Sequence, residues 1–404
     1  MAKTGPAKYS ASTSLQGYLY QCRYAFLLML KRIRTSATAH LAIEKFDDVS
    51  FETGGKPSDL VQTKFHGTPG NLTDASEDWW KTLNIWCEGV RDKHFLLPGV
   101  TFSLITTQTA PVGSAAEALR ATTSKRNPAR ADDLLLKVAT TSTNVSLAKA
   151  FDVFKKLPKP KRLEMLNEVF IFDAACSVGD LDNPLLEELR FVAPRNHEKS
   201  FLDHIEGWWL RRLITHLDTA GQPAIRGGEV QEAIEQMRDT FADDNLPIQR
   251  PLPDPPHAPD PATDHRQFVQ CLRRLRLTDV RLRQSILDFY RASVHRDRWV
   301  TDTLINFEEI EDYDERLLGE WDRTCDSLMS ELGTAGVDPV ALGKKLFFRL
   351  DEDAARFGVF FIRPKCTEPA ISRGSLHKLA DSGRLGWHPD EVTALRTVAA
   401  RGSP

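Results

Sequence analysis

Four polar residues near the N-terminus have the types and the spacing needed for metal-assisted phosphodiester hydrolysis. Glu44 and Asp48 precede one predicted strand, and Gln62 and Lys64 lie two residues apart in the next. Because side chains at positions i and i+2 of a strand point to the same face, Gln62 and Lys64 project together. A short hairpin between the two strands would bring Asp48 close to both side chains.

Carboxylate and amide oxygens are the ligands that hard cations such as Mg²⁺ prefer. We therefore predict that Asp48 and Gln62 bind Mg²⁺ (or Mn²⁺), with Glu44 as a further ligand or a base. Such a metal generates hydroxide from water and neutralises charge in the transition state. Lys64 would orient the attacking water or stabilise that charge. The alternative is a solvated sheet face, on which an acid, an amide and a lysine occur by chance and contribute little to stability.

The hydrophobic pattern of residues 12–106 indicates the elements that would position these side chains. Apolar residues recur at helical spacing over residues 12–34 and again over residues 79–90. Runs typical of strands cover residues 40–44, 49–52, 59–65 and 100–106. Gly54 and Gly55 predict a hairpin turn before the third run. These elements would form a small α/β domain.

From residue 116 onward the sequence pattern is helical. Amphipathic spacing predicts helices over residues 132–140, 144–154, 160–170, 185–191, 201–218, 229–241, 264–276, 279–294, 308–331 and from 390. The proline-rich segment Leu246–Ala262 cannot be a helix or a central strand, and we interpret it as a semi-rigid extended linker. The predicted fold class is an α+β/α multidomain protein. Its predicted parts are residues 1–115, a helical region 116–250, a linker 251–263 and a helical C-terminal module 264–404.

The composition of the chain excludes several classes of protein. The 404 residues are 41% hydrophobic and 27% charged, which is typical of a globular protein and not of a disordered or fibrous one. No apolar run is long enough for a transmembrane helix, and the first residues lack the apolar core of a signal peptide, so we expect a cytoplasmic protein. Six scattered cysteines without a Cys-x-x-Cys pair argue against disulfides and structural zinc. The net charge of −3 requires that any nucleic-acid contact use a local basic surface.

A set of motifs in the first ~110 residues supports the hydrolytic interpretation. They are Gly17, Tyr20-Gln21, Ile43-Glu44, Asp47-Asp48, Val61-Gln62-Thr63-Lys64-Phe65-His66 and the segment from Trp79 to Trp86. On these motifs the region resembles the restriction-type PD-(D/E)xK nucleases, in the subgroup of effectors of bacterial anti-phage systems, where Gln-x-Lys commonly replaces acid-x-Lys. The resemblance implies a restriction-endonuclease-like fold in which Asp48 and Gln62 bind metal, Lys64 is the catalytic lysine and Glu44 supports the site. Whether Asp47 or Asp48 is the ligand stays open, since only one could point into the site from a regular strand.

A second set of motifs follows in the rest of the chain. It consists of Ile205–Trp209, Asp244–Ile248, Asp288–Ala292, Arg296–Trp299, Glu311–Leu317 and Leu385–Pro389. This part resembles the C-terminal module of effectors in ABC-ATPase three-component defence systems, the group that includes Lamassu. The two resemblances imply a Mg²⁺-dependent double-stranded DNA endonuclease that an SMC/ABC-like ATPase and a small middle subunit hold inactive. Release would let it self-associate, as a tetramer, so that two sites meet opposite strands.

Basic residues offer two candidate contacts with nucleic acid. Arg23, Lys31, Arg32 and Arg34 on the first predicted helix are the candidates for the DNA backbone. The basic-aromatic stretch of residues 273–299 either contacts phosphates or pairs with the acidic helix of residues 308–315. Two other functions remain open: a non-catalytic DNA-binding or adaptor subunit of the same complex, and a nuclease that acts on RNA.

Overall fold

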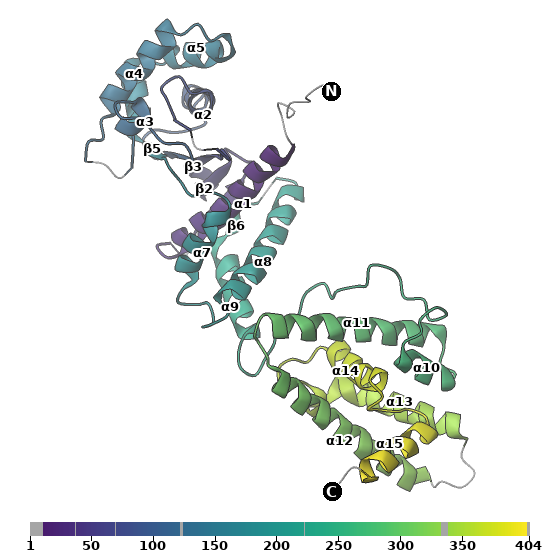
Figure 1. Cartoon of the computed structure of the whole chain (residues 1–404). Helices are drawn as coiled ribbons and strands as arrows, with labels where there is room; N and C mark the ends of the chain where they lie inside the picture. The colour runs from purple at the N-terminus through teal and green to yellow at the C-terminus, as the bar shows by residue number, and fades with distance from the viewer. Residues whose placement is uncertain are drawn as a thin grey trace. The chain divides into compact units, whose positions relative to one another are not determined.

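The chain divides into two compact units in the computed structural model (Figure 1). The described residues are 11–36, 38–68, 70–121, 124–221, 223–332 and 338–401. The N-terminal unit comprises Met1–Ala193 and Leu202–Glu235, and the C-terminal unit comprises Pro194–Phe201 and Gln236–Pro404. The predicted boundary at residue 115 therefore falls inside the N-terminal unit. None of the helices in the described part of the chain is long and apolar enough to cross a membrane.

A mixed sheet of six strands forms the centre of the N-terminal unit, in the order β5-β4-β3-β2-β1-β6. Its strands are β1 (His40–Ile43), β2 (Val49–Thr53), β3 (Lys56–Lys64), β4 (Thr101–Thr106), β5 (Val169–Phe172) and β6 (Ile225–Arg226). β3, β4 and β5 run parallel to one another, and the other pairs are antiparallel. The four predicted strands and the hairpin turn are confirmed, whereas β5 and β6 come from regions with no predicted strand.

The prediction of one helix over residues 160–170 is wrong at its end. Helix α6 (Lys159–Asn167) stops before Val169, and residues 169–172 pair with β4 instead. The sequence Val-Phe-Ile-Phe combines β-branched and aromatic residues, which fit a pleated, half-buried surface better than a helix. A strand from this distant part of the chain therefore completes the parallel side of the sheet.

The two faces of the sheet are covered by different helices. Leu60 of β3 lies in one hydrophobic core with the tryptophans of α2 (Glu77–Arg91), including Trp86. On the other face, the ring of Phe65 lies 5.4 Å from that of Tyr20 in α1 (Ala11–Ile33). Since β3 side chains alternate, Gln62 shares the α2 face with Leu60.

Several further helices surround this sheet. They are α3 (Ala115–Ala118), α4 (Pro128–Thr141), α5 (Ala148–Lys156), α7 (Asp182–Leu189), α8 (Glu198–Asp218) and α9 (Gly227–Thr240), with the boundary between the units falling inside α8 and α9. Trp209 of α8 stacks on Phe26 of α1 at 5.2 Å between ring centroids and donates a hydrogen bond of 2.9 Å to the carbonyl of Cys22. Helix α8 therefore packs on α1.

The described part of the C-terminal unit is helical. Its remaining helices are α10 (Gln267–Arg274), α11 (Asp279–Thr301), α12 (Phe307–Leu332), α13 (Pro339–Arg356), α14 (Pro369–Asp381) and α15 (Pro389–Arg401). Helices α13 and α14 were not predicted from the sequence. A Cβ atom on Gly374 of α14 would lie 2.0 Å from the carbonyl oxygen of Asp288 in α11, so only glycine permits this close approach of the two helices.

The proline-rich segment Leu246–Ala262 contains no helix or strand, as predicted. It does not extend freely, however, because it packs against α11 within the C-terminal unit. Trp299 donates a hydrogen bond of 2.9 Å to the carbonyl of Pro247, and Arg291 donates one of 2.8 Å to Asp254. The segment is therefore part of this unit and not a linker between two domains.

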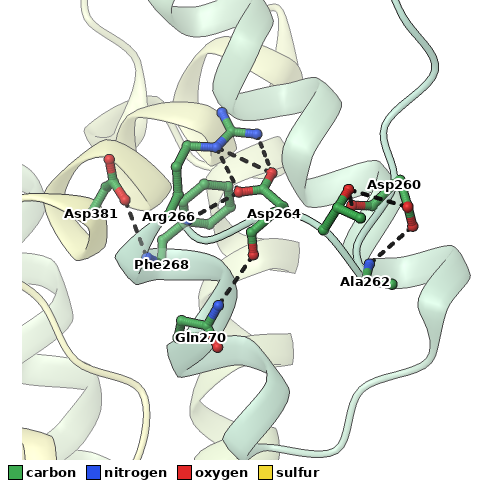
Figure 2. Close-up of polar contacts among 8 residues, drawn as sticks. Asp260, Ala262, Asp264, Arg266, Phe268, Gln270 and Asp381 are labelled. Atoms are coloured by element: carbon green, nitrogen blue, oxygen red, sulfur yellow. Dashed lines mark hydrogen bonds and ion pairs between the residues drawn. The ribbon is translucent and has the colours of Figure 1, made fainter.

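Polar contacts fix the end of this segment to the start of α10 (Figure 2). The guanidinium of Arg266 pairs with the carboxylate of Asp264, and the side-chain amide of Gln270 donates a hydrogen bond of 3.1 Å to the backbone carbonyl of Asp264. Asp381 of α14 accepts a hydrogen bond of 3.3 Å from the backbone N–H of Phe268, which has no partner within its own helix. Helix α10 is thereby attached to α14.

Candidate metal-binding and catalytic site

Asp47 and Asp48 both direct a carboxylate to the side-chain amide of Gln62. The amide nitrogen of Gln62 donates to Oδ1 of Asp48 at 2.7 Å and to Oδ1 of Asp47 in a shorter contact. The other oxygen of Asp48 accepts hydrogen bonds from the backbone N–H of Thr63 at 2.8 Å and from its hydroxyl at 3.2 Å. The predicted pair of Asp48 and Gln62 is therefore in direct contact.

Both aspartates reach Gln62 because neither lies in a regular strand. β2 begins at Val49, and residues 44–48 form a bend before it. Glu44 starts this bend with φ at +56°, a left-handed conformation that is uncommon outside glycine. The limit of one inward-pointing carboxylate, which holds for a regular strand, therefore does not apply to Asp47 and Asp48.

Asp47 is the more buried of the two aspartates. Its side chain accepts a hydrogen bond of 2.9 Å from the indole N–H of Trp86 and another of 3.1 Å from the backbone N–H of Asp48. Burial and, to a smaller extent, the neighbouring Asp48 carboxylate raise the pKa of Asp47 to about 6, against the lowering effect of its hydrogen bonds. Asp48 is only half-buried, so its carboxylate is the one more accessible to a ligand.

Gln21 of α1 holds the bend in place from the opposite side. Its amide nitrogen donates to Oε1 of Glu44 at 2.8 Å and to the carbonyl of Asp48 at 2.7 Å. The backbone N–H of Glu44 also donates to that carbonyl, at 3.2 Å. Glu44 is therefore brought beside Asp48, with an exposed side chain whose carboxylate is oriented by α1.

Lys64 ends β3 on the same face as Gln62. Its side chain is half-buried, and within the described ranges no hydrogen bond or ion pair occupies its ammonium group. Two residues further on, the imidazole of His66 lies 2.7 Å from the carboxylate of Asp78 at the start of α2. The ammonium group of Lys64 is thus available at the end of the strand that carries Gln62.

The donor set fits a hard divalent cation with an incomplete protein shell. Two carboxylates converge on one amide, and within the described residues no cationic side chain forms a hydrogen bond or an ion pair with either carboxylate. The amide nitrogen of Gln62 faces them, so its amide oxygen would have to take that place to become a ligand beside the carboxylate oxygens. Among the described residues no group of three or more His, Cys, Asp or Glu side chains forms a complete metal site. Mg²⁺ is commonly bound by one or two carboxylates with water and phosphate in the remaining positions, so Asp47 and Asp48 could hold it in this way.

Three of the four cations predicted to contact DNA are occupied within the chain. Arg23 pairs with Glu206 at 2.7 Å and Asp182 at 2.6 Å, Arg32 pairs with Asp59 at 2.7 Å, and Arg34 pairs with Glu188 at 2.8 Å. Arg23 and Arg32 lie in α1, the helix that covers the face of the sheet opposite Gln62, and Arg34 directly follows α1. Lys31 is exposed, and it is the remaining candidate of this set.

Five of the eight arginines in the basic stretch of residues 273–299 form ion pairs within the described part of the chain. Arg296 binds Asp314 of α12 at 2.8 Å in a buried ion pair, as the acidic-partner alternative predicted. Arg281 pairs with Asp351 of α13. These arginines therefore stabilise the C-terminal unit and are not a free phosphate-binding surface.

The motifs of the first ~110 residues include Gln21, Thr63 and Trp86, but their contacts with the site were not predicted from the sequence. Trp86 lies seven residues after Trp79 on the apolar face of α2, and that spacing predicts only packing. The use of its indole N–H by Asp47 depends on the distance between α2 and the bend. No local pattern of residues encodes that distance.

Comparisons with known proteins assign the C-terminal part of the chain. Residues 268–395 match C-terminal domain 7 of the ABC-three component (ABC-3C) systems. This match supports membership of the chain in such a system, as the second set of motifs predicted, and it does not show whether the chain is an enzyme. No match was found among curated proteins.

Among solved structures, the similar chains include two Cap4 SAVED/CARF-domain containing receptors. The receptor from Acinetobacter baumannii is 15% identical with a TM-score of 0.33, over 58% of this chain and 49% of that one. The receptor from Moraxella osloensis is 15% identical with a TM-score of 0.34, over 55% of this chain and 48% of that one. The chain thus spans about half the length of these structures, and at such scores the likeness carries no conclusion about function.

Proposed function

We propose that this chain, whose residues 268–395 match C-terminal domain 7 of the ABC-3C systems, is the metal-dependent DNA endonuclease of an anti-phage system of that kind. The observation that supports the proposal is the convergence of Asp47 and Asp48 on Gln62, with Lys64 two residues further along the same strand face. Carboxylates, an amide and a nearby unpaired lysine meet the requirements of phosphodiester hydrolysis.

Each side chain has a separate task in the proposed reaction. Asp48 and the amide oxygen of Gln62 would hold Mg²⁺, which supplies a hydroxide nucleophile and neutralises phosphate charge. Turning that oxygen to the metal exchanges the positions of oxygen and nitrogen at the end of the Gln62 side chain. Lys64 would orient the attacking water or stabilise the negative charge of the transition state. Glu44, fixed by Gln21, would support the metal or accept a proton from water.

The C-terminal unit supports control by partner proteins. In this proposal an SMC/ABC-like ATPase and a small middle subunit hold the nuclease inactive, and release lets the chain self-associate as a tetramer. Two sites related by symmetry could then cut opposite strands of a duplex. The competing function is a non-catalytic adaptor of the same complex.

Plasmid cleavage by the purified full-length chain tests the proposal. With Mg²⁺, the wild type is expected to cut DNA, whereas Lys64→Ala and Asp48→Ala should each lower the rate by about 10²-fold or more. Lys137→Ala, an exposed lysine of α4, is the matched control and should leave the rate unchanged. EDTA should abolish cleavage by every sample.

The mass in solution is measured for every sample, and single strands and RNA are tested beside the plasmid. An assembled, folded wild type that cuts none of these substrates would favour the adaptor. Cleavage of RNA but not of DNA would favour an RNA-directed nuclease. Equal cleavage by wild type and Lys64→Ala would move the catalytic site elsewhere.

A further inference from the structure

A hollow lined by apolar and basic side chains lies in the N-terminal unit, and it contains none of the candidate catalytic residues. It has a volume of about 390 Å³ and opens between the end of α2, the segment 93–97 and the turn that joins α5 to α6. Sites for small molecules commonly have volumes of about 300–1,000 Å³ and mostly apolar walls with a few polar groups. This hollow is within that range.

Apolar side chains form the floor of this hollow. Val90, Phe95, Leu96 and Leu157 line it. The ring of Phe95 lies against Gly89, where a Cβ atom would be 2.2 Å from the ring, so the glycine allows the ring to approach α2 closely. Leu96 is 54% exposed although it is a large apolar residue, and it offers a contact surface to a ligand.

Positive charge surrounds the apolar floor. Lys93, Lys156 and Lys161 line the hollow, and no Asp or Glu does. Lys161 pairs with Glu164 at 2.7 Å, but in the described part of the chain no ion pair or hydrogen bond engages the ammonium groups of Lys93 and Lys156. Lys93 also has φ at +61°, an uncommon conformation that fixes where its side chain leaves the backbone.

The first turn of α6 adds to this positive field. Helix N-termini carry partial positive charge and usually have acidic residues in the first turn. The first turn of α6 has no acidic residue and instead contains Lys159 and Lys161. A bound anion would offset the repulsion between these lysines and the helix dipole, so this helix end adds to the preference of the hollow for a negatively charged ligand.

We infer that this hollow binds a nucleotide. Its phosphate would contact Lys93 and Lys156 near the first turn of α6, and its base would lie on Leu96 and Leu157. A neighbouring hollow of about 440 Å³ shares Lys93 and Leu96, so a second phosphate could lie there.

This nucleotide site is separate from the candidate catalytic site. The neighbouring hollow is lined by Lys56 at the beginning of β3, whereas Lys64 ends that strand. A strand of nine residues spans roughly 25 Å, so Lys64 lies at the far end of β3 from the neighbouring hollow. None of the residues that line the nucleotide hollow is a candidate catalytic residue. The nucleotide site therefore does not depend on the proposed nuclease activity.

Isothermal titration calorimetry of the full chain with AMP, ATP and inorganic phosphate tests the inference. AMP and ATP are expected to bind in the micromolar to submillimolar range, and phosphate at least tenfold more weakly because it cannot use the apolar floor. Lys93→Gln and Lys156→Gln should each weaken AMP binding about fivefold to tenfold. Lys155→Gln is the matched control, since Lys155 is the preceding residue of α5 and does not line the hollow.

Leu96→Asp is a second variant that does not disturb the core, because Leu96 is exposed, and it should abolish AMP binding. Lys64→Ala should bind AMP as well as the wild type, whether or not the chain cuts DNA. The inference is overturned if AMP and ATP do not bind at millimolar concentration. It is also overturned if Lys93→Gln and Lys156→Gln both bind AMP as tightly as the wild type. Phosphate that binds as tightly as AMP would reduce the hollow to a simple anion site. A DNA duplex that binds there in place of nucleotides would assign it to a DNA surface.

Discussion

Two buried aspartates of the N-terminal unit are stabilised in opposite ways. Asp132 of α4 is 0% exposed and accepts two hydrogen bonds, of 2.6 and 3.1 Å, from the guanidinium of Arg162 in α6. Asp47, in the bend between β1 and β2, is 8% exposed. It accepts hydrogen bonds from uncharged groups only: the indole N–H of Trp86, the amide of Gln62 and the backbone N–H of Asp48. The carboxylate nearest to Asp47 is Asp48, which has the same charge.

The difference is between a carboxylate whose charge is compensated by a cation and one whose partners are neutral. A buried carboxylate that is paired with arginine has its charge compensated within the fold. Asp47 and Asp48 lie together without such compensation; burial raises the pKa of Asp47, and the neighbouring Asp48 carboxylate adds to the effect. Paired carboxylates with a shifted pKa are typical of sites that bind cations or transfer protons.

Removing the arginine of the compensated pair is expected to have the largest effect. Arg162→Met leaves Asp132 buried and unpaired, which should lower the free energy of unfolding by about 3–5 kcal/mol. Urea unfolding at neutral pH measures this loss. The double variant Asp132→Leu with Arg162→Met should recover much of it, because no unpaired charge remains. A loss below about 1 kcal/mol in Arg162→Met would remove the contrast between the two sites.

Neutralising Asp47 should instead stabilise the metal-free chain. The folded-state pKa of about 6 lies above the unfolded value of 3.8, so the folded chain binds the proton more tightly and stability falls as pH rises from about 4 to about 6. The free energy of unfolding of Asp47→Asn should not fall in this pH range, and above pH 6 it should exceed that of the wild type by up to about 3 kcal/mol. Urea unfolding in EDTA across this pH range measures the gap between variant and wild type. A gap that stays constant with pH would contradict the prediction.

Loss of the amide that orients Glu44 should have the smallest effect. Gln21→Ala removes hydrogen bonds of 2.8 Å to Glu44 and 2.7 Å to the Asp48 carbonyl, at a cost of about 1 kcal/mol in stability. If the chain cuts DNA as proposed, the rate should fall about tenfold as the bend loses its fixed position. Gln16→Ala, an exposed glutamine of the same helix, is the control. A Gln21 variant that cuts at the wild-type rate would show that Glu44 needs no orientation.

Local pattern was enough to predict the elements that carry the candidate site. Period-two alternation in β3 predicted that Gln62 and Lys64 share a face, and the glycine pair predicted the hairpin that brings Asp48 to them. The same reasoning failed for β5 and β6, because those short strands are defined by partners more than 60 and 180 residues away in the sequence. Short segments of this kind have too few residues to show a period.

The residue types and spacings by themselves determined which side chains could act together: two adjacent acids, then an amide and a lysine at strand spacing. Only the tertiary structure decided how they are charged and oriented. It turned both Asp47 and Asp48 toward one amide, and it placed Trp86 behind them. It also engaged Arg23, on which the DNA-binding prediction partly rested, with carboxylates distant in sequence. The physical reason is that periodicity reports the direction of a side chain from its own backbone, whereas its partners and its burial depend on segments brought together by folding.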